Sequence, residues 1–267
     1  MNQMAWLSYN LIGWPASLVR LDLALTLLAA HLMGDFVLQT EQMVRGKRRP
    51  GWLFLHVAII VVLSYALVGH WFSFLIPLVI GVSHAIIDSI KARVPGGATV
   101  FVIDQLAHFA VIGAIALFAS FFGTVSFWTV LFGKTYWVIL AFVCGVILTV
   151  RTGGLLVGFW VQPYLEEMRA AGAQPETTFK LIRGLTNGGR LIGQWERALI
   201  FLFVGMGLPG SVGFLVAAKS IFRFGELKER ENRMEAEYIT IGTLMSFGWA
   251  LAVSSLTWWG IHTILAL

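Results

Sequence analysis

Three histidine–aspartate pairs with a spacing of four residues lie in apolar stretches between residues 31 and 108. On a helix, residues four apart share a face, so each pair directs an imidazole and a carboxylate to the same side. These groups are ligands for zinc, iron and manganese. A further histidine lies in the apolar stretch WLFLHVAIIVVL. The predicted metal ligands are His31, Asp35, His56, His84, Asp88, Asp104 and His108.

The composition of the chain indicates an integral membrane protein. Apolar residues make up 58% of the chain and charged residues only 12%, and the mean hydropathy is +0.80. Apolar runs of about 20 residues are long enough to cross a bilayer as helices. We therefore expect an all-α, polytopic membrane protein with about eight transmembrane helices. The expected spans are 21–39, 51–69, 72–92, 101–121, 135–158, 189–207, 210–224 and 237–265.

The basic residues predict how these helices are oriented. With eight spans, most arginines and lysines fall on the side of the loops at 40–50 and 160–188, whereas the other side keeps Arg20 and Lys134. The positive-inside rule assigns the richer side to the cytoplasm. We expect a multi-pass protein of the bacterial cytoplasmic (inner) membrane with both termini outside. The net charge of +5 then reflects topology and contact with membrane lipid, and no nucleic-acid partner is expected.

The same topology brings all seven predicted ligands to one depth, in roughly the cytoplasmic third of the bilayer at about 1.5 Å of rise per residue. Ionisable groups near the bilayer centre cost about 2.5–3.5 kcal/mol each, and a bound cation offsets the charge of carboxylates. The expected cofactor is a divalent transition metal, with zinc as the first choice. Seven groups allow one ion with some aspartates orienting histidines, or two ions. A proton or ion relay and purely structural polar contacts are the alternatives.

A second polar set is predicted at the same depth in the C-terminal part of the chain. It offers either a cradle for an anionic group or local salt bridges with basic side chains that reach the interface. Its members are Glu196, Arg197, Lys219 and Arg223. We divide the chain into a His/Asp membrane domain at 1–121, a fifth helix with a cytoplasmic loop at 122–188, and C-terminal helices at 189–267. The segment YLEEMRA is expected to form a short amphipathic helix within the loop.

Several motifs together resemble a known family. They are HLMGDFVLQTEQMV, His56, HAIID with Lys91, and FVIDQLAH. This set is similar to the bacterial membrane protein family catalogued as domain of unknown function 3307, over about residues 25–112. The segments GRLIGQWER, AAKSIFRF and EAEYITIGTLMS look like the C-terminal half of its longer members. The family name implies no activity. By analogy alone, the ligands scattered over several helices also look like those of membrane metal hydrolases of the alkaline ceramidase type.

The sequence therefore favours a metal-dependent hydrolase that acts on a lipid-linked or amphipathic substrate at the cytoplasmic leaflet. Asp35 or Asp88 is the expected general base, and the second polar set is expected to bind an anionic group of the substrate in a cavity shared with the metal. A secondary transporter or metal-ion carrier that uses the same His/Asp residues is the alternative from another class. A structural or regulatory membrane partner would need no metal.

Overall fold

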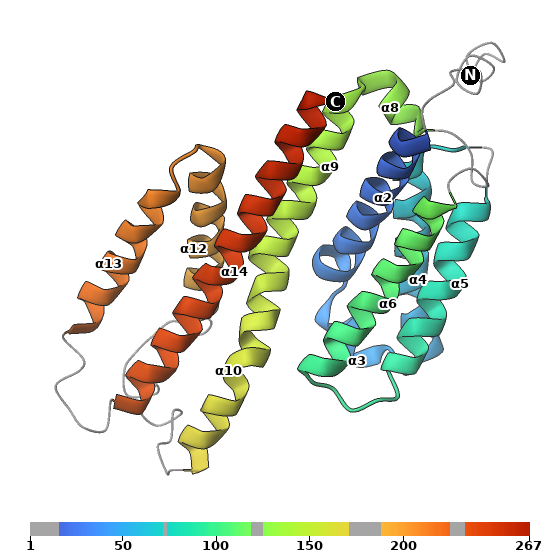
Figure 1. Ribbon diagram of the computed structural model, residues 1–267. Coiled ribbons are helices and arrows are strands. Elements are labelled where there is room, and N and C mark those ends of the chain that lie inside the picture. Colours follow the sequence, from blue (N-terminus) through green and yellow to red (C-terminus); the bar gives the residue numbers. More distant parts are fainter. Residues whose placement is uncertain (1–15, 72–73, 119–124, 171–187, 225–232) are drawn as a thin grey trace. The chain divides into compact units, whose positions relative to one another are not determined.

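The computed structural model describes residues 16–71, 74–118, 125–170, 188–224 and 233–267. Within these ranges every regular element is a helix (Figure 1), as the sequence predicts. The contacts divide the chain into two compact units. The first unit comprises residues 1–147 and 260–267, and the second comprises residues 148–259. The division of the chain into segments 1–121, 122–188 and 189–267, which rests on their polar residues, stays a prediction.

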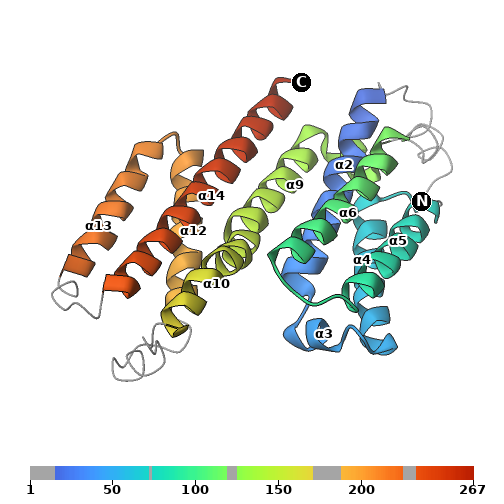
Figure 2. The same cartoon turned by 60° about the horizontal axis from the view of Figure 1, so that its bottom comes forward.

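The first unit is built around a ring of four helices. These are α2 (Ala16–Met33), α4 (Pro50–Val68), α5 (Leu75–Lys91) and α6 (Ala98–Leu117). Helices α2 and α5 each contact both α4 and α6, which closes the ring (Figure 2). Short connections make successive helices antiparallel. The last turns of α2 and α5 therefore lie at the same end of the ring as the first turns of α4 and α6.

The interior of this ring is apolar along most of its length. Buried side chains from all four helices contribute to it, among them Leu23, Leu27, Ile60, Ile76 and Ile112. Gly81 allows α4 to come close, because a Cβ atom built there would lie 2.7 Å from the Val61 side chain. This apolar packing holds the four helices in register and so fixes the depth of the polar side chains at one end of the ring.

Local sequence signals set the helix boundaries at that end. A π-helical turn, η1 (Gly34–Leu38), continues α2, and the short helix α3 (Glu41–Gly46) follows it. The Thr40 side chain caps α3 by accepting a hydrogen bond from the Met43 N–H at 3.3 Å. Pro50 begins α4 at a position where its missing N–H costs nothing. At the other end of α4, Gly69 adopts the left-handed conformation that commonly ends a helix.

A buried carboxylate anchors the opposite end of α2. Asp22 is 1% exposed and accepts hydrogen bonds from the Ser126 N–H at 2.5 Å and from Trp137 Nε1 at 2.7 Å. The Thr129 hydroxyl donates a third bond to it. These donors belong to α8 (Phe127–Phe132), its N-cap, and α9 (Lys134–Val146). Residues 127–132 thus form a short separate helix tied to α2.

In its described residues, the second unit contains four helices and two short turns. The π-helical segment η2 (Ile147–Thr152) continues α9 into α10 (Gly153–Ala170). Then follow α12 (Gly188–Gly205), the 3₁₀ turn η3 (Pro209–Ser211), α13 (Val212–Phe224) and α14 (Arg233–Ala266), whose last residues belong to the first unit. Ile200, Val212, Phe247 and Ala250 form its apolar core. YLEEMRA is the end of α10 and not a separate helix, because the chain stays helical through Pro163.

All eight predicted spans coincide with helices, but only five helices in the described ranges are long and apolar enough to cross a membrane. Helices α5 and α13 have 17 and 13 residues, and α12 carries several charged residues. The five candidates identify a membrane protein, and the count of eight spans stays a prediction. The candidate spans are 17–38, 50–68, 98–117, 134–170 and 236–266.

Replacing the buried anchor should destabilise the protein without touching the polar end of the ring. Asp22→Ala leaves three buried donors without their charged acceptor, which we expect to lower the unfolding free energy by about 2–4 kcal/mol. Thermal unfolding in detergent measures the loss. The control is Glu41→Ala, because the Glu41 and Arg45 side chains pair while 77% and 82% exposed. An equal effect of the two substitutions would contradict the anchoring role.

Candidate metal centre

The structure brings all seven predicted ligands together at one end of the four-helix ring. They form three overlapping groups in which the potential ligand atoms lie within 4.8 Å of one another. None of the seven side chains is more than 5% exposed. The groups are His31/His84/His108, Asp35/His56/His84 and Asp88/Asp104/His108. The convergence in depth inferred from the sequence therefore corresponds to convergence in space.

Each ring helix supplies part of this His/Asp cluster. Helix α2 provides His31, and the wider turn η1 provides Asp35. His56 lies in the second turn of α4. The last two turns of α5 carry the pair HAIID, and the early turns of α6 carry the pair DQLAH. Because neighbouring helices run in opposite directions, the ends of two and the beginnings of two others meet at this level.

The group around His56 has the dimensions of one face of a tetrahedral metal site. His56 Nε2 lies 3.0 Å from His84 Nε2 and 3.2 Å from Asp35 Oδ1, and His84 Nε2 lies 3.5 Å from the same oxygen. Ligands bound to zinc at 2.0–2.1 Å in a tetrahedron are about 3.3–3.4 Å apart. Asp88 Oδ2 lies 3.3 Å and 3.5 Å from the same two nitrogens. Either carboxylate can therefore complete a three-ligand face with the two histidines.

The hydrogen bonds of His108 leave one of its ring nitrogens ready to bind a metal. His108 Nδ1 lies 2.8 Å from the Asp104 carbonyl oxygen. A carbonyl only accepts, so the ring proton resides on Nδ1 and Nε2 carries a lone pair. This is the usual way in which metal-binding histidines are oriented.

Several atoms of the cluster that a cation would satisfy have no hydrogen-bond partner among the described residues. They are Asp35 Oδ1, Asp104 Oδ1 and His108 Nε2. Buried polar atoms without partners are rare and costly. The two carboxylate oxygens are acceptors, and His108 Nε2 is an acceptor because the ring proton is on Nδ1. A cation therefore matches all three atoms. The residues of the cluster therefore fit a metal ion.

Three residues that the sequence analysis did not select also belong to the cluster. Lys47 Nζ donates to Asp88 Oδ1 at 2.9 Å and lies 2.8 Å from Oδ2. Lys91 donates to Asp104 Oδ2. Gln105 Nε2 donates to the same oxygen at 3.0 Å, while its Oε1 lies 3.2 Å from His31 Nε2. These contacts orient two of the carboxylates and link one of them to a histidine.

Of these three residues, only Lys91 has a sequence signal that indicates its position near the cluster. Lys91 lies three positions after Asp88 and so near the same helix face, which marks it as a neighbour of the cluster. Gln105 directly follows Asp104 but has no charge to draw attention. Lys47 stands in the basic run GKRRP, and nothing in the sequence separates it from the exposed arginines beside it.

The charges of the cluster favour a single divalent ion. Three carboxylates and two ammonium groups leave one net negative charge when the imidazoles are neutral. One divalent cation changes this sum to one positive charge, and two such ions would change it to three. A larger uncompensated charge is costly within a helix bundle. The arrangement therefore fits one ion better than two.

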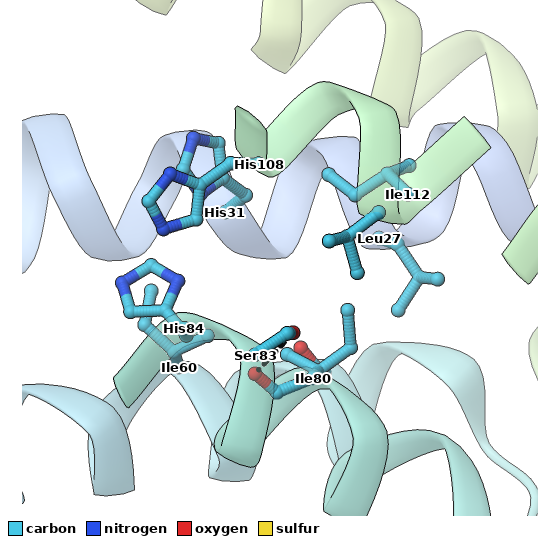
Figure 3. A pocket seen from close by; sticks show the side chains of 10 residues that line it. Leu27, His31, Ile60, Ile80, Ser83, His84, His108 and Ile112 are labelled. Atoms are coloured by element: carbon cyan, nitrogen blue, oxygen red, sulfur yellow. Dashed lines mark hydrogen bonds between the residues drawn. The ribbon is translucent and has the colours of Figure 1, made fainter. Parts of the chain in front are cut away.

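A small cavity begins at the histidines and extends along the apolar interior of the ring (Figure 3). His31, His84 and His108 line one end, and the rings of His84 and His108 have centroids 4.2 Å apart. The cavity has room for about one water molecule. Its other lining is mostly apolar, with the hydroxyl groups of two serines: Leu27, Ile60, Ser64, Ile80, Ser83, Val111 and Ile112. The histidines thus separate a dry interior from the polar end of the bundle.

The second polar set lies in the second unit and is held by contacts within that unit. The Arg197 guanidinium is buried and donates to the Val150 carbonyl oxygen at 3.0 and 3.2 Å and to the Ser246 hydroxyl at 3.0 Å. Gly154 makes room for it, because a Cβ atom there would lie 2.8 Å from Nη2. Lys219 pairs with Glu196 at 2.9 Å.

These contacts agree with the local-salt-bridge alternative for Glu196 and Lys219. Arg197 instead binds a backbone carbonyl of the π-helical segment η2, which a regular helix would have paired internally. Arg223 lies in the last turn of α13, and its side chain is outside the described residues. The role of all four in binding an anionic group of the substrate stays a prediction.

One known protein family matches the part of the chain that contains the His/Asp cluster. The family described as "Protein of unknown function (DUF3307)" matches residues 23–139. The match covers the whole four-helix ring after the start of α2, together with α8 and the first turns of α9, so the DUF3307 region includes every member of the His/Asp cluster. No curated protein and no solved structure matched the chain.

The metal content of purified protein tests the cluster directly. We expect close to stoichiometric transition metal in the wild type, measured by elemental mass spectrometry after supplementation with zinc, iron or manganese. His84→Ala and His108→Ala should each reduce occupancy at least about tenfold, because each residue belongs to two ligand groups. His262→Ala is the matched control, since His262 is an exposed histidine. Equal metal content in all three variants would contradict the assignment.

Proposed function

We propose that the protein is a metal-dependent hydrolase that acts on a lipid-linked or amphipathic substrate. The observation that carries this proposal is the set of buried acceptor atoms without hydrogen-bond partners on the His/Asp cluster. A purely structural polar cluster would pair such atoms with one another. A cluster that binds a metal leaves them directed at the ion.

The proposed ion is zinc, held by His56 and His84 with Asp35 or Asp88. Two imidazoles and one carboxylate are a known ligand set of catalytic zinc, which leaves a further position for water or substrate. The metal would polarise the scissile bond and favour attack by water at neutral pH. His108, oriented by the Asp104 carbonyl, is a further ligand close to the same centre.

Asp35 is the better placed of the two predicted general bases. Both oxygens of Asp88 contact Lys47, whereas the contacts that the structure shows for Asp35 are with His31, His56 and His84. An oxygen already bound to an ammonium group is a poor acceptor for another proton. We therefore assign Asp88 to holding the ion and Asp35 to accepting a proton from water, with His31 4.0 Å from its second oxygen.

The location of the cluster supports a substrate that lies in the membrane. The site is at one end of the helical ring and not at its middle, so a headgroup can reach it while apolar chains stay in lipid. The outer faces of α5 and α6 expose Ile86, Ile90, Ile103 and Leu106, as lipid-facing helices do. The positive-inside rule places this end at the cytoplasmic leaflet.

Turnover by the purified protein tests the proposal. Metal-loaded protein in mixed micelles should hydrolyse at least one of a panel of amphipathic phosphate esters, carboxylic esters and amides. Chelation of the metal should abolish the reaction until zinc is restored. Asp35→Asn should lower kcat by about 10²–10⁴-fold, as expected for loss of a general base, while much of the metal is retained. The matched control is Glu41→Gln, which alters an exposed carboxylate nearby in the chain.

The same variants separate the hydrolase from the transporter alternative. If the metal-loaded protein hydrolyses none of these substrates but carries zinc or protons across proteoliposomes in a His84-dependent way, the hydrolase proposal is wrong. The transporter alternative predicts flux in intact vesicles, which an enzyme restricted to one leaflet does not produce.

The orientation is a separate prediction. Compartment reporters fused after Arg49 and after Leu267 should report opposite sides, the first cytoplasmic and the second periplasmic, because the predicted spans place the basic loop at 40–50 inside and the C-terminus outside. The same compartment for both fusions would contradict the eight-span topology and leave the cluster itself unaffected.

A further inference from the structure

Two lysines from different elements reach the same side of the His/Asp cluster. Lys47 directly follows α3 and is 8% exposed, and its ammonium group contacts both oxygens of Asp88. Lys91 is the last residue of α5 and contacts Asp104. Its ammonium group also lies 5.7 Å from the centre of the Phe101 ring. The Asp88 and Asp104 oxygens belong to one ligand group and lie within 4.8 Å of each other.

Neutralising the carboxylates does not by itself account for both lysines. A bound divalent ion already offsets two negative charges, and a buried ion pair is often no more stabilising than an apolar pair of the same size. With one ion and both lysines, the centre carries one positive charge in excess. An excess positive charge at the edge of a membrane bundle is a site for an anion.

We propose that Lys47 and Lys91 form an anion subsite beside the metal, and that the group it binds is a singly charged phosphate ester. This inference rests on the proposed hydrolase and names its substrate class. A phosphodiester carries one negative charge and would bring the sum to zero. Its two non-bridging oxygens allow one to approach the metal while the other accepts from a lysine. Lysine is a common phosphate ligand that acts as a point charge.

The surface around the two lysines favours a lipid as the source of this phosphate. Exposed arginines flank both of them in the chain, and the Arg48 Nε–H donates to the Ala92 carbonyl oxygen at 2.8 Å, which joins the two basic segments. Basic clusters at the cytoplasmic face of membrane helices attract anionic headgroups. The exposed members are Arg45, Arg48, Arg49 and Arg93. A phospholipid headgroup would meet these arginines before it reaches the lysines.

Calorimetric titration of the full-length, zinc-loaded protein in detergent tests the subsite. The probes are hexyl methylphosphonate, a singly charged ester that resists hydrolysis, and inorganic phosphate. We expect Lys91→Gln to weaken binding of both probes about tenfold, the effect of one lost charged hydrogen bond, without loss of zinc. Lys91→Arg should restore part of the affinity. The matched control is Lys134→Gln, an exposed lysine at the start of α9, which should leave binding unchanged.

Lys47→Met provides the second variant, because its side chain keeps the length of lysine without the charge. It should also weaken both probes, with zinc content and elution volume recording whether the protein is folded and loaded. Tighter binding of the hexyl ester than of inorganic phosphate supports a lipid source, and the reverse order supports a free phosphate. Retained zinc with unchanged binding in Lys91→Gln and Lys47→Met overturns this subsite alone. Absence of zinc from the wild type overturns the proposed function together with it.

Discussion

Three carboxylates buried at one end of a helical ring are the constraint on which the rest of the first unit depends. Asp35, Asp88 and Asp104 have side chains 5% exposed or less. Removing an ionised carboxylate from water costs several kcal/mol unless paired charges and hydrogen bonds offset it. The four histidines, two lysines and one glutamine around them are therefore requirements of the fold as much as elements of a site. The rest of the ring interior is apolar, and the contacts at its polar end determine how the four helices are arranged.

This constraint explains why lysines accompany a cluster whose side chains could hold a metal ion. Lysines alone would leave one carboxylate unpaired, and a metal alone would leave the outer carboxylate oxygens without donors. Lys47 and Lys91 bind the carboxylates of α5 and α6, while Asp35 meets histidines from three helices. Three imidazoles of the cluster line the apolar cavity, whereas the two ammonium groups contact carboxylates.

The sequence predicts the helices and the cluster for physical reasons. The same reasons do not predict the residues that contact the cluster from outside. Apolar runs and the four-residue spacing report directly on helix faces, so the spans and the seven ligands follow from local pattern. The family match over residues 23–139 agrees with the motifs that carry the resemblance. Lys47 could not be singled out, because a basic run beside a helix has the same composition whether one of its side chains is buried or all are exposed. Arg197 itself was predicted, but its partner was not, since the acceptor is a backbone carbonyl in a π-helical segment and no residue type encodes that contact.

The anchor at Asp22 bears on how this bundle can move. Three donors from the α8–α9 region converge on one carboxylate of α2. Hydrogen bonds to charged groups contribute about 1.5–3 kcal/mol each, so sliding or tilting α2 against α9 would cost about 4–9 kcal/mol. A state that costly is populated less than about once in a thousand molecules. In any mechanism that opens the His/Asp cluster, α2 must therefore stay in place relative to α8 and α9.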